Sequence, residues 1–133
     1  MCSSYDRKPV ALAIYIGLAG AAGSISRHVV GLGLARFGGR LPYATLAVNV
    51  LGAFVIGVAM AWFAARGQLD TRVRSVITVG FLGGFTTYSA FAFETVTLLE
   101  KKQAGLAAAY VALTLVAAGG CCYLGMLLGR ALR

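Results

Sequence analysis

Acidic and metal-binding side chains are scarce in this sequence. Among 133 residues there are 4 Asp and Glu together and 1 His, against 12 Lys and Arg. The apolar part of the chain therefore holds no pair of acids for hydrolysis, no Ser-His-Asp set and no His or Cys cluster for a metal. There is no nucleotide-binding motif either. These absences argue against an enzyme.

Cysteine is also too rare to build a disulfide framework. Its three members are Cys2, Cys121 and Cys122, two of them adjacent, and neither a CxxC motif nor a His cluster accompanies them. Adjacent cysteines rarely pair with each other. We interpret them as small apolar residues.

Charge of either sign is sparse along most of the chain. Charged residues make up 12% and hydrophobic residues 59%, and the charged share is about half that of soluble domains. Uncharged runs cover 9–26, 41–65, 75–93 and 103–129, and each reaches or approaches the roughly 20 residues that cross a bilayer. The sequence predicts an all-α membrane protein of one transmembrane domain, 1–133, with helices at about 10–35, 42–65, 75–99 and 104–128.

The first apolar run has the alternative of a signal peptide, because Arg7 and Lys8 precede it. It lacks a convincing cleavage site, and apolar sequence resumes after Arg27 and His28 as far as Ala35. We interpret it as a helix of the mature protein.

The net charge of +8 would suggest nucleic acid if the domain were soluble. Here most Lys and Arg fall in the loops and tails, where they meet lipid headgroups, and no basic stripe interleaves with exposed aromatics. We therefore expect the lipid bilayer as a partner and no nucleic acid. With four spans, seven basic residues lie on the side of the termini and four on the other, which orients the chain only weakly: Arg7, Lys8, Arg66, Arg72, Arg74, Arg130 and Arg133 against Arg36, Arg40, Lys101 and Lys102.

Residues 80–94, GFLGGFTTYSAFAFE, have features that a simple membrane anchor does not need. The adjacent Gly83 and Gly84 are weak helix formers, so we expect the third predicted helix to break near Gly83–Thr86. A break leaves carbonyl groups unpaired, and in a membrane these need protein, water or a cation. A buried monovalent cation is a natural companion to this break.

Isolated polar residues in the other spans have two interpretations each. Arg27 either faces protein or water, or extends to the interface. Asn49 either joins two helices or lines a wet path, and Thr45 lies one turn earlier on its face. Tyr110 and Thr114 share a face at i and i+4, with core packing as the alternative.

These polar residues are mostly neutral donors, with one cation and one acid. A narrow, donor-rich path with apolar walls suits a small anion, because hydroxyl and amide groups replace its water and aromatic ring edges add weak attraction. Four helices cannot surround a wide pore, so the conduit is narrow or lies between subunits. The set comprises Arg27, Asn49, Thr86, Thr87, Tyr88, Ser89, Glu94, Tyr110 and Thr114.

Three stretches resemble the motifs of one family, the fluoride channels called Fluc or CrcB. The stretch GFLGGFTTYSAFAFE resembles GFxGGxTTFSTFxxE, AGAAGSISRH resembles GGxxGAxxRY, and ATLAVNVLGAF resembles GTLxVNxxGxF. They occur in the same order and spacing and together cover essentially the whole chain. The resemblance implies a multi-pass channel of the cell (inner or plasma) membrane that exports fluoride passively and reduces fluoride toxicity.

The resemblance also implies an antiparallel, dual-topology homodimer with two fluoride paths. It implies a structural sodium ion at the dimer centre, held by the backbone carbonyls of Gly83 and Thr86. Arg27 matches the family's arginine in the first span, and we group it with Glu94 as structural polar residues. The expected fluoride path comprises Asn49, Tyr88, Phe91, Tyr110 and Thr114, to which we add the donor Ser89.

Two departures from the motif leave alternatives. Tyr88 stands where the motif has Phe, and Ala90 stands where it has Thr, so one alternative is a non-equivalent subunit of a heterodimeric channel. The other alternative is a proton-coupled small multidrug-type transporter. That design uses a membrane-embedded acid in its first helix, whereas the candidate acid here is Glu94 in the third.

Overall fold

The computed structural model describes residues 7–36, 39–66 and 71–132, and the described chain is helical, with no strand among these residues. Cys2 and Arg133 lie outside them. Three helices are long and continuous, and the third span is assembled from four shorter elements. The long helices are α1 (Arg7–Ala35), α2 (Tyr43–Ala65) and α6 (Ala104–Ala131), and the third span comprises α3 (Thr71–Ser75), the π-helix η1 (Val76–Leu82), α4 (Gly83–Phe85) and α5 (Tyr88–Glu100).

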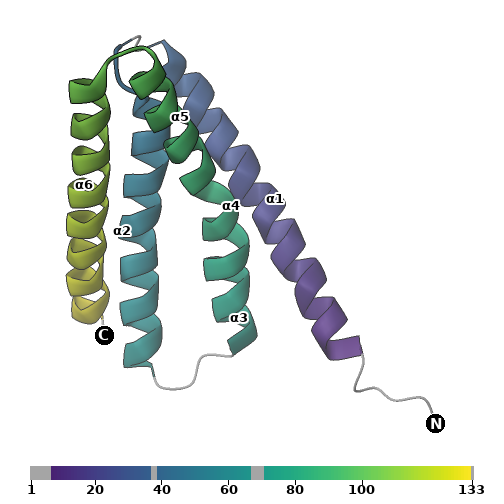
Figure 1. The fold of residues 1–133 in the computed structure, drawn as a ribbon. Coiled ribbons are helices and arrows are strands. Elements are labelled where there is room, and N and C mark those ends of the chain that lie inside the picture. The colour runs from purple at the N-terminus through teal and green to yellow at the C-terminus, as the bar shows by residue number, and fades with distance from the viewer. Residues whose placement is uncertain (1–6, 37–38, 67–70, 133) are drawn as a thin grey trace.

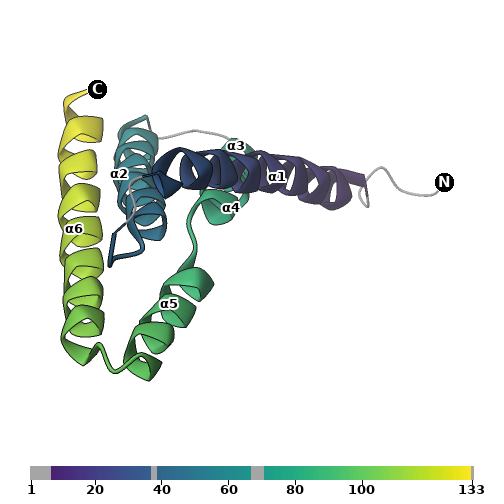
Figure 2. The same cartoon turned by 90° about the horizontal axis from the view of Figure 1, so that it is seen from above.

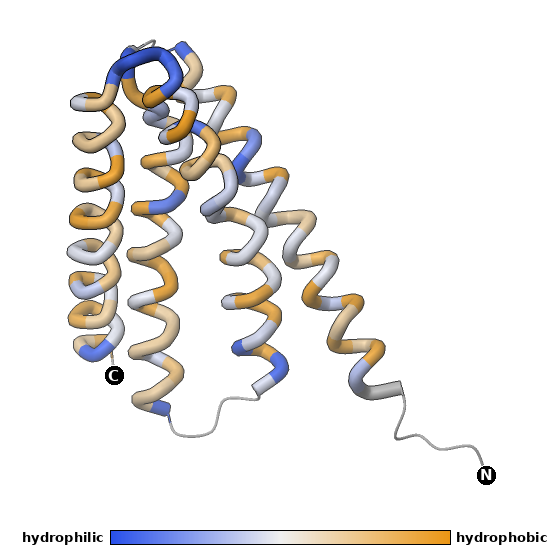
Figure 3. Tube along the Cα trace, in the orientation of Figure 1, coloured by the Kyte–Doolittle hydropathy of each residue, from blue (hydrophilic) through white to orange (hydrophobic). Residues whose placement is uncertain are grey.

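Within the described residues, four segments are long and apolar enough to cross a membrane: Pro9–Ala35, Tyr43–Ala65, Thr71–Glu100 and Ala104–Ala131. This confirms the four predicted spans. Figure 3 shows hydrophobic residues along the helices, hydrophilic residues gathered near the helix ends, and a few hydrophilic positions partway along α1 and α2. The protein is therefore a multi-pass membrane protein.

The helices run alternately up and down, so the start of α1 and the end of α6 lie at the same end of the molecule (Figure 1). The α2 and α6 helices run side by side, whereas α1 slants away from them. Seen from above, α1 and α6 lie on different sides of α2, and α5 runs from near α4 toward the start of α6 (Figure 2). A single chain is thus an open arrangement whose helices leave much apolar surface uncovered.

Glycines allow the closest helix contacts. At Gly57 a side chain would collide with the backbone oxygen of Cys122, and at Gly125 with that of Phe54, which brings α2 and α6 together. Small residues at an interface let membrane helices approach in this way. Cys121 and Cys122 are free and half-buried in α6, consistent with their interpretation as small apolar residues.

Close contacts at glycines also join α1 to the third span. A side chain at Gly84 would collide with the backbone oxygen of Gly20, and one at Gly23 would collide with that of Phe81. Ser24 donates from its hydroxyl to the carbonyl of Gly84 at 3.5 Å. The small-residue spacing of Gly20 and Ser24 in the sequence therefore corresponds to a face of α1 that packs on the third span.

The third span contains two extended residues, Thr86 and Thr87, which we call the extended pair. Thr86 has φ −85° and ψ 160°, and Thr87 has φ −148° and ψ 112°. Gly83, the first residue of the predicted break near Gly83–Thr86, is itself helical at φ −63° and ψ −36°, whereas Thr86, the last, is extended. The extended pair lies just beyond the glycines because its backbone has partners on other helices.

Candidate functional site

Asn49 of α2 pairs with the backbone of the extended pair. Its Nδ2 donates to the Thr87 carbonyl at 3.1 Å, and its Oδ1 accepts from the Thr87 amide at 2.8 Å. One side chain thus satisfies both backbone groups of a residue that has left the helix. Unpaired backbone groups are costly inside a membrane, so these two bonds explain how the chain keeps extended residues here.

Arg27 of α1 supports the residue before it. Its Nη1 donates to the Thr86 carbonyl at 3.2 Å, and the side chain is half-buried. Carbonyl groups at the end of a helix lack partners within that helix, and α1 supplies donors to two of them, Arg27 at Thr86 and Ser24 at Gly84. Of the two interpretations of Arg27, the contact with protein is the one observed.

Thr87 also begins the next helix. Its Oγ1 accepts from the amide of Ala90 at 3.2 Å, as an N-cap side chain does. The same oxygen lies 3.3 Å from Ser89 Oγ, a pair in which either hydroxyl can donate. The positive end of the α5 dipole and the exposed Ser89 hydroxyl are therefore located partway along the third span.

Glu94 of α5 connects three helices. Its Oε1 accepts from the Thr45 hydroxyl of α2 at 2.7 Å, and its Oε2 accepts from the Tyr110 hydroxyl of α6 at 2.7 Å. Thr45 and Tyr110 are buried. Thr114, also buried, donates instead to the carbonyl of Tyr110 in its own helix at 2.8 Å.

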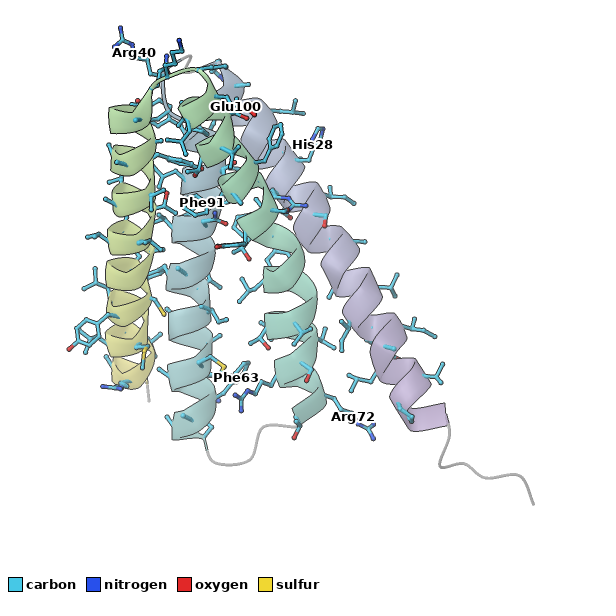
Figure 4. The ribbon with its side chains drawn as sticks, viewed as in Figure 1. His28, Arg40, Phe63, Arg72, Phe91 and Glu100 are labelled. Carbon is cyan, nitrogen blue, oxygen red and sulfur yellow. The ribbon has the colours of Figure 1, made fainter. Side chains whose placement is uncertain are left out.

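Three aromatic rings form a row from the surface of α5 to the core. The ring centroids of Tyr88 and Phe91 are 5.9 Å apart, and those of Phe91 and Tyr110 are 5.3 Å apart, with planes inclined by 53°. Tyr88 is 81% exposed, Phe91 8% and Tyr110 0%. Figure 4 shows Phe91 directed toward α2 and α6, and His28 projecting away from the bundle.

Two pockets adjoin the extended pair, one containing Thr87 and the other Thr86. The larger, of about 290 Å³, brings a guanidinium and three hydroxyl side chains together. It is lined by Arg27, Gly31, Ala44, Thr45, Val48, Thr87, Ser89 and Ala90. The smaller, of about 210 Å³, is lined by Asn49, Gly52, Ala53, Ile56, Thr78, Leu82, Gly83 and Thr86.

The hydrogen bonds divide the expected path residues into two groups. The hydroxyl hydrogens of Tyr110 and Thr114 are already donated to protein oxygens, so neither is free for an anion in this state. Ser89 is exposed and shares its hydroxyl with Thr87. Of these three hydroxyl groups, the one at the start of α5, Ser89, is therefore the most accessible to an anion.

Thr45 and Thr87 carry more of the site than the sequence reasoning assigned to them. Thr45 was recognisable as one turn from Asn49 on the same face, but its acceptor Glu94 lies on another span. Thr87 follows Thr86 in the motif, and its polar side chain before an apolar helix is a capping signal. The pairing of Thr45 and Asn49 with the third span could not be read from local sequence.

The chain is similar to known proteins over most of its length. A family model described as CrcB-like protein, Camphor Resistance (CrcB), matches residues 14–126. Three relatives carry the name "Fluoride-specific ion channel FluC". The one from Geobacter sp. (strain M21) is 42% identical over 120 residues, which are 90% of this chain and 97% of the relative.

The other two relatives are also similar to this chain over most of its length. The protein of Caulobacter vibrioides (strain NA1000 / CB15N) is 38% identical over 119 residues, covering 88% of this chain and 94% of the relative. That of Cereibacter sphaeroides (strain ATCC 17029 / ATH 2.4.9) is 44% identical over 102 residues, covering 76% of this chain and 80% of the relative.

Proposed function

Because this chain belongs to the CrcB family, whose relatives above are named fluoride-specific ion channels, we propose that it conducts fluoride along the start of α5. The protein is a fluoride channel and not an enzyme. The observation that carries this conclusion is the family match across residues 14–126, which spans the whole site. A passive channel lowers cytoplasmic fluoride, since fluoride that enters acidified cells as HF dissociates inside and leaves down its gradient.

The proposed path uses the positive end of α5 and the groups around it. Arg27 gives the 290 Å³ pocket a positive charge, which favours entry of an anion. Ser89 and the ring edges of Tyr88 and Phe91 then replace part of the water around fluoride. Tyr110 and Thr114 support this row from α6, because their hydroxyl groups are engaged with protein oxygens.

The break of the third span has a second proposed role, as a sodium site. When bound, sodium supplies a positive charge that satisfies carbonyl oxygens in the membrane. The residues present fit such an ion: the Thr87 amide bonds Asn49, which deprives the Gly83 carbonyl of its helical partner, and Gly83 is exposed. The Thr86 carbonyl oxygen has two lone pairs. One accepts the hydrogen bond from Arg27, and the other is left for sodium.

We propose further that two copies assemble antiparallel, with dual topology, in the inner or plasma membrane. Two carbonyls from one chain are too few to surround a cation, and a second copy would double them. The exposed rings of Tyr88 (81%) and Phe93 (74%) sit in a span that a lone chain leaves uncovered. Native mass spectrometry of the purified protein tests the assembly: a dimer supports it, and a monomer that conducts fluoride contradicts it.

A growth assay tests the function in cells. Fluoride-sensitive cells that lack their own exporter should grow in fluoride medium when they express this chain alone. If the chain reaches the membrane and growth is not restored, it is an accessory or heterodimer subunit and not a channel by itself. The same cells expressing the Phe91→Ile variant, for which reduced fluoride flux is expected, are the comparison at equal expression.

A further inference from the structure

We infer that Asn49 acts on fluoride flow through the backbone of Thr87, as a positioning residue that fixes the start of α5. This inference rests on the proposed path along α5, but its structural part does not. Asn49 uses both ends of its carboxamide on one residue, donating at 3.1 Å and accepting at 2.8 Å. That pairing occupies the carboxamide oxygen and one of the two Nδ2 hydrogens, so a single hydrogen is left for an anion.

The chemistry of the carboxamide supports positioning over ion binding. The Asn49 oxygen is an acceptor and repels an anion, and it is already paired with the Thr87 amide. Of the two hydrogens on Nδ2, one is donated to the Thr87 carbonyl. A direct role toward fluoride would depend on the single remaining hydrogen, whereas the positioning role uses the two bonds observed.

The position of Thr87 is passed on to α5 through its own side chain. Its Oγ1 accepts from the Ala90 amide and so caps the helix that carries Ser89 and Phe91. One turn from Asn49 along α2, Thr45 donates to Glu94 of the same helix. Thus α2 is hydrogen-bonded to α5 at two points. Asn49 contacts the start of α5 through Thr87, and Thr45 contacts its middle through Glu94.

Hydrogen exchange of the Thr87 amide tests this directly, in purified protein and fluoride-free buffer. Asn49→Leu and Asn49→Ala both remove the oxygen that accepts from the Thr87 amide. Their side chains differ in size, so the test can be made with whichever variant still assembles. Exchange should become about tenfold faster, equivalent to about 1.4 kcal/mol. Asn49→Asp keeps an oxygen for the amide and should stay within about threefold of the unmodified protein. Thr114→Val, which removes a buried hydroxyl bonded within its own helix, is the control and should leave exchange at Thr87 unchanged.

Flux from liposomes at increasing fluoride separates positioning from ion binding. In Asn49→Leu or Asn49→Ala the maximal flux should fall by about tenfold, while the fluoride concentration for half-maximal flux stays within about threefold. Unchanged exchange at Thr87 would overturn the inference. So would a half-maximal concentration raised tenfold or more with maximal flux retained, because that marks a fluoride ligand. If the unmodified protein conducts no fluoride, the proposed function fails, and the exchange result still decides whether Asn49 holds Thr87.

Discussion

The Tyr110 hydroxyl donates to Glu94 Oε2 at 2.7 Å across the interface of α5 and α6. The other carboxyl oxygen accepts from Thr45 of α2 at the same distance, so both oxygens of this acid are engaged by neighbouring helices. A carboxyl group inside a membrane needs such partners. Tyr110 also packs against the Phe91 ring, and the two ring centroids are 5.3 Å apart.

The Glu94–Tyr110 bond should couple the two residues energetically. In a double-mutant cycle of Glu94→Gln and Tyr110→Phe, we expect a coupling energy of about 1–2 kcal/mol in the free energy of unfolding. Denaturant unfolding in detergent, followed by helical circular dichroism, measures it. Tyr123→Phe, an exposed position on α6, should be additive with Glu94→Gln; additivity for Tyr110 as well would contradict the bond.

Replacing Phe91 should suppress fluoride flux with the protein still assembled. An aliphatic side chain has no positive ring edge, and an aromatic contact is worth about 0.5–1.5 kcal/mol, so Phe91→Ile should lower flux by up to about tenfold. Tyr123→Ile on α6 is the control, because Tyr123 is 60% exposed and outside the row of rings. Equal flux in both variants would exclude Phe91 from the path.

The close approach of α1 to the third span should make Gly84 intolerant of a side chain. A methyl group there would collide with the backbone oxygen of Gly20, so Gly84→Ala should cost about 1–3 kcal/mol of unfolding free energy. Gly119→Ala is the control, since a side chain there meets nothing within 4 Å, and it should stabilise by about 0.5–1 kcal/mol. A neutral Gly84→Ala would contradict the packing of α1 described above.

Sodium should stabilise the purified protein if it binds the proposed carbonyl site. A ligand at a hundred times its dissociation constant adds about 2.7 kcal/mol, so the unfolding temperature should rise as sodium is added. N-methyl-D-glucamine chloride at the same ionic strength is the control. Identical unfolding in the two salts would mean that the Gly83 and Thr86 carbonyls hold no sodium.

Sequence patterns were sufficient for the four spans, because a membrane helix is marked by a long uncharged run. They were less informative inside the third span. The glycine pair predicts a break near Gly83–Thr86, whereas the extended residues are Thr86, at the end of that range, and Thr87, just beyond it. Their positions depend on Asn49, 38 residues away, and on Arg27, 59 residues away, and such contacts are not encoded in local propensity. The π-helix η1 carried no sequence signal that we recognised.

For the polar residues too, the sequence indicated which residues are important but not which residues they contact. The sequence singled out Asn49, Tyr110 and Glu94 because each is unusual in an apolar segment. It did not indicate that Tyr110 and Thr45 both donate to Glu94, since these three residues come from three different helices. The roles of individual residues along the ion path remain predictions for the flux measurements.

Efflux from liposomes tests most directly whether the protein conducts fluoride selectively and passively. Liposomes containing the purified protein are loaded with fluoride or chloride, diluted into buffer without that anion, and followed with ion-selective electrodes. We expect rapid fluoride efflux without any proton gradient, and chloride efflux no faster than from empty liposomes. Chloride efflux equal to fluoride efflux, or fluoride efflux only across a pH gradient, would contradict selective, passive conduction.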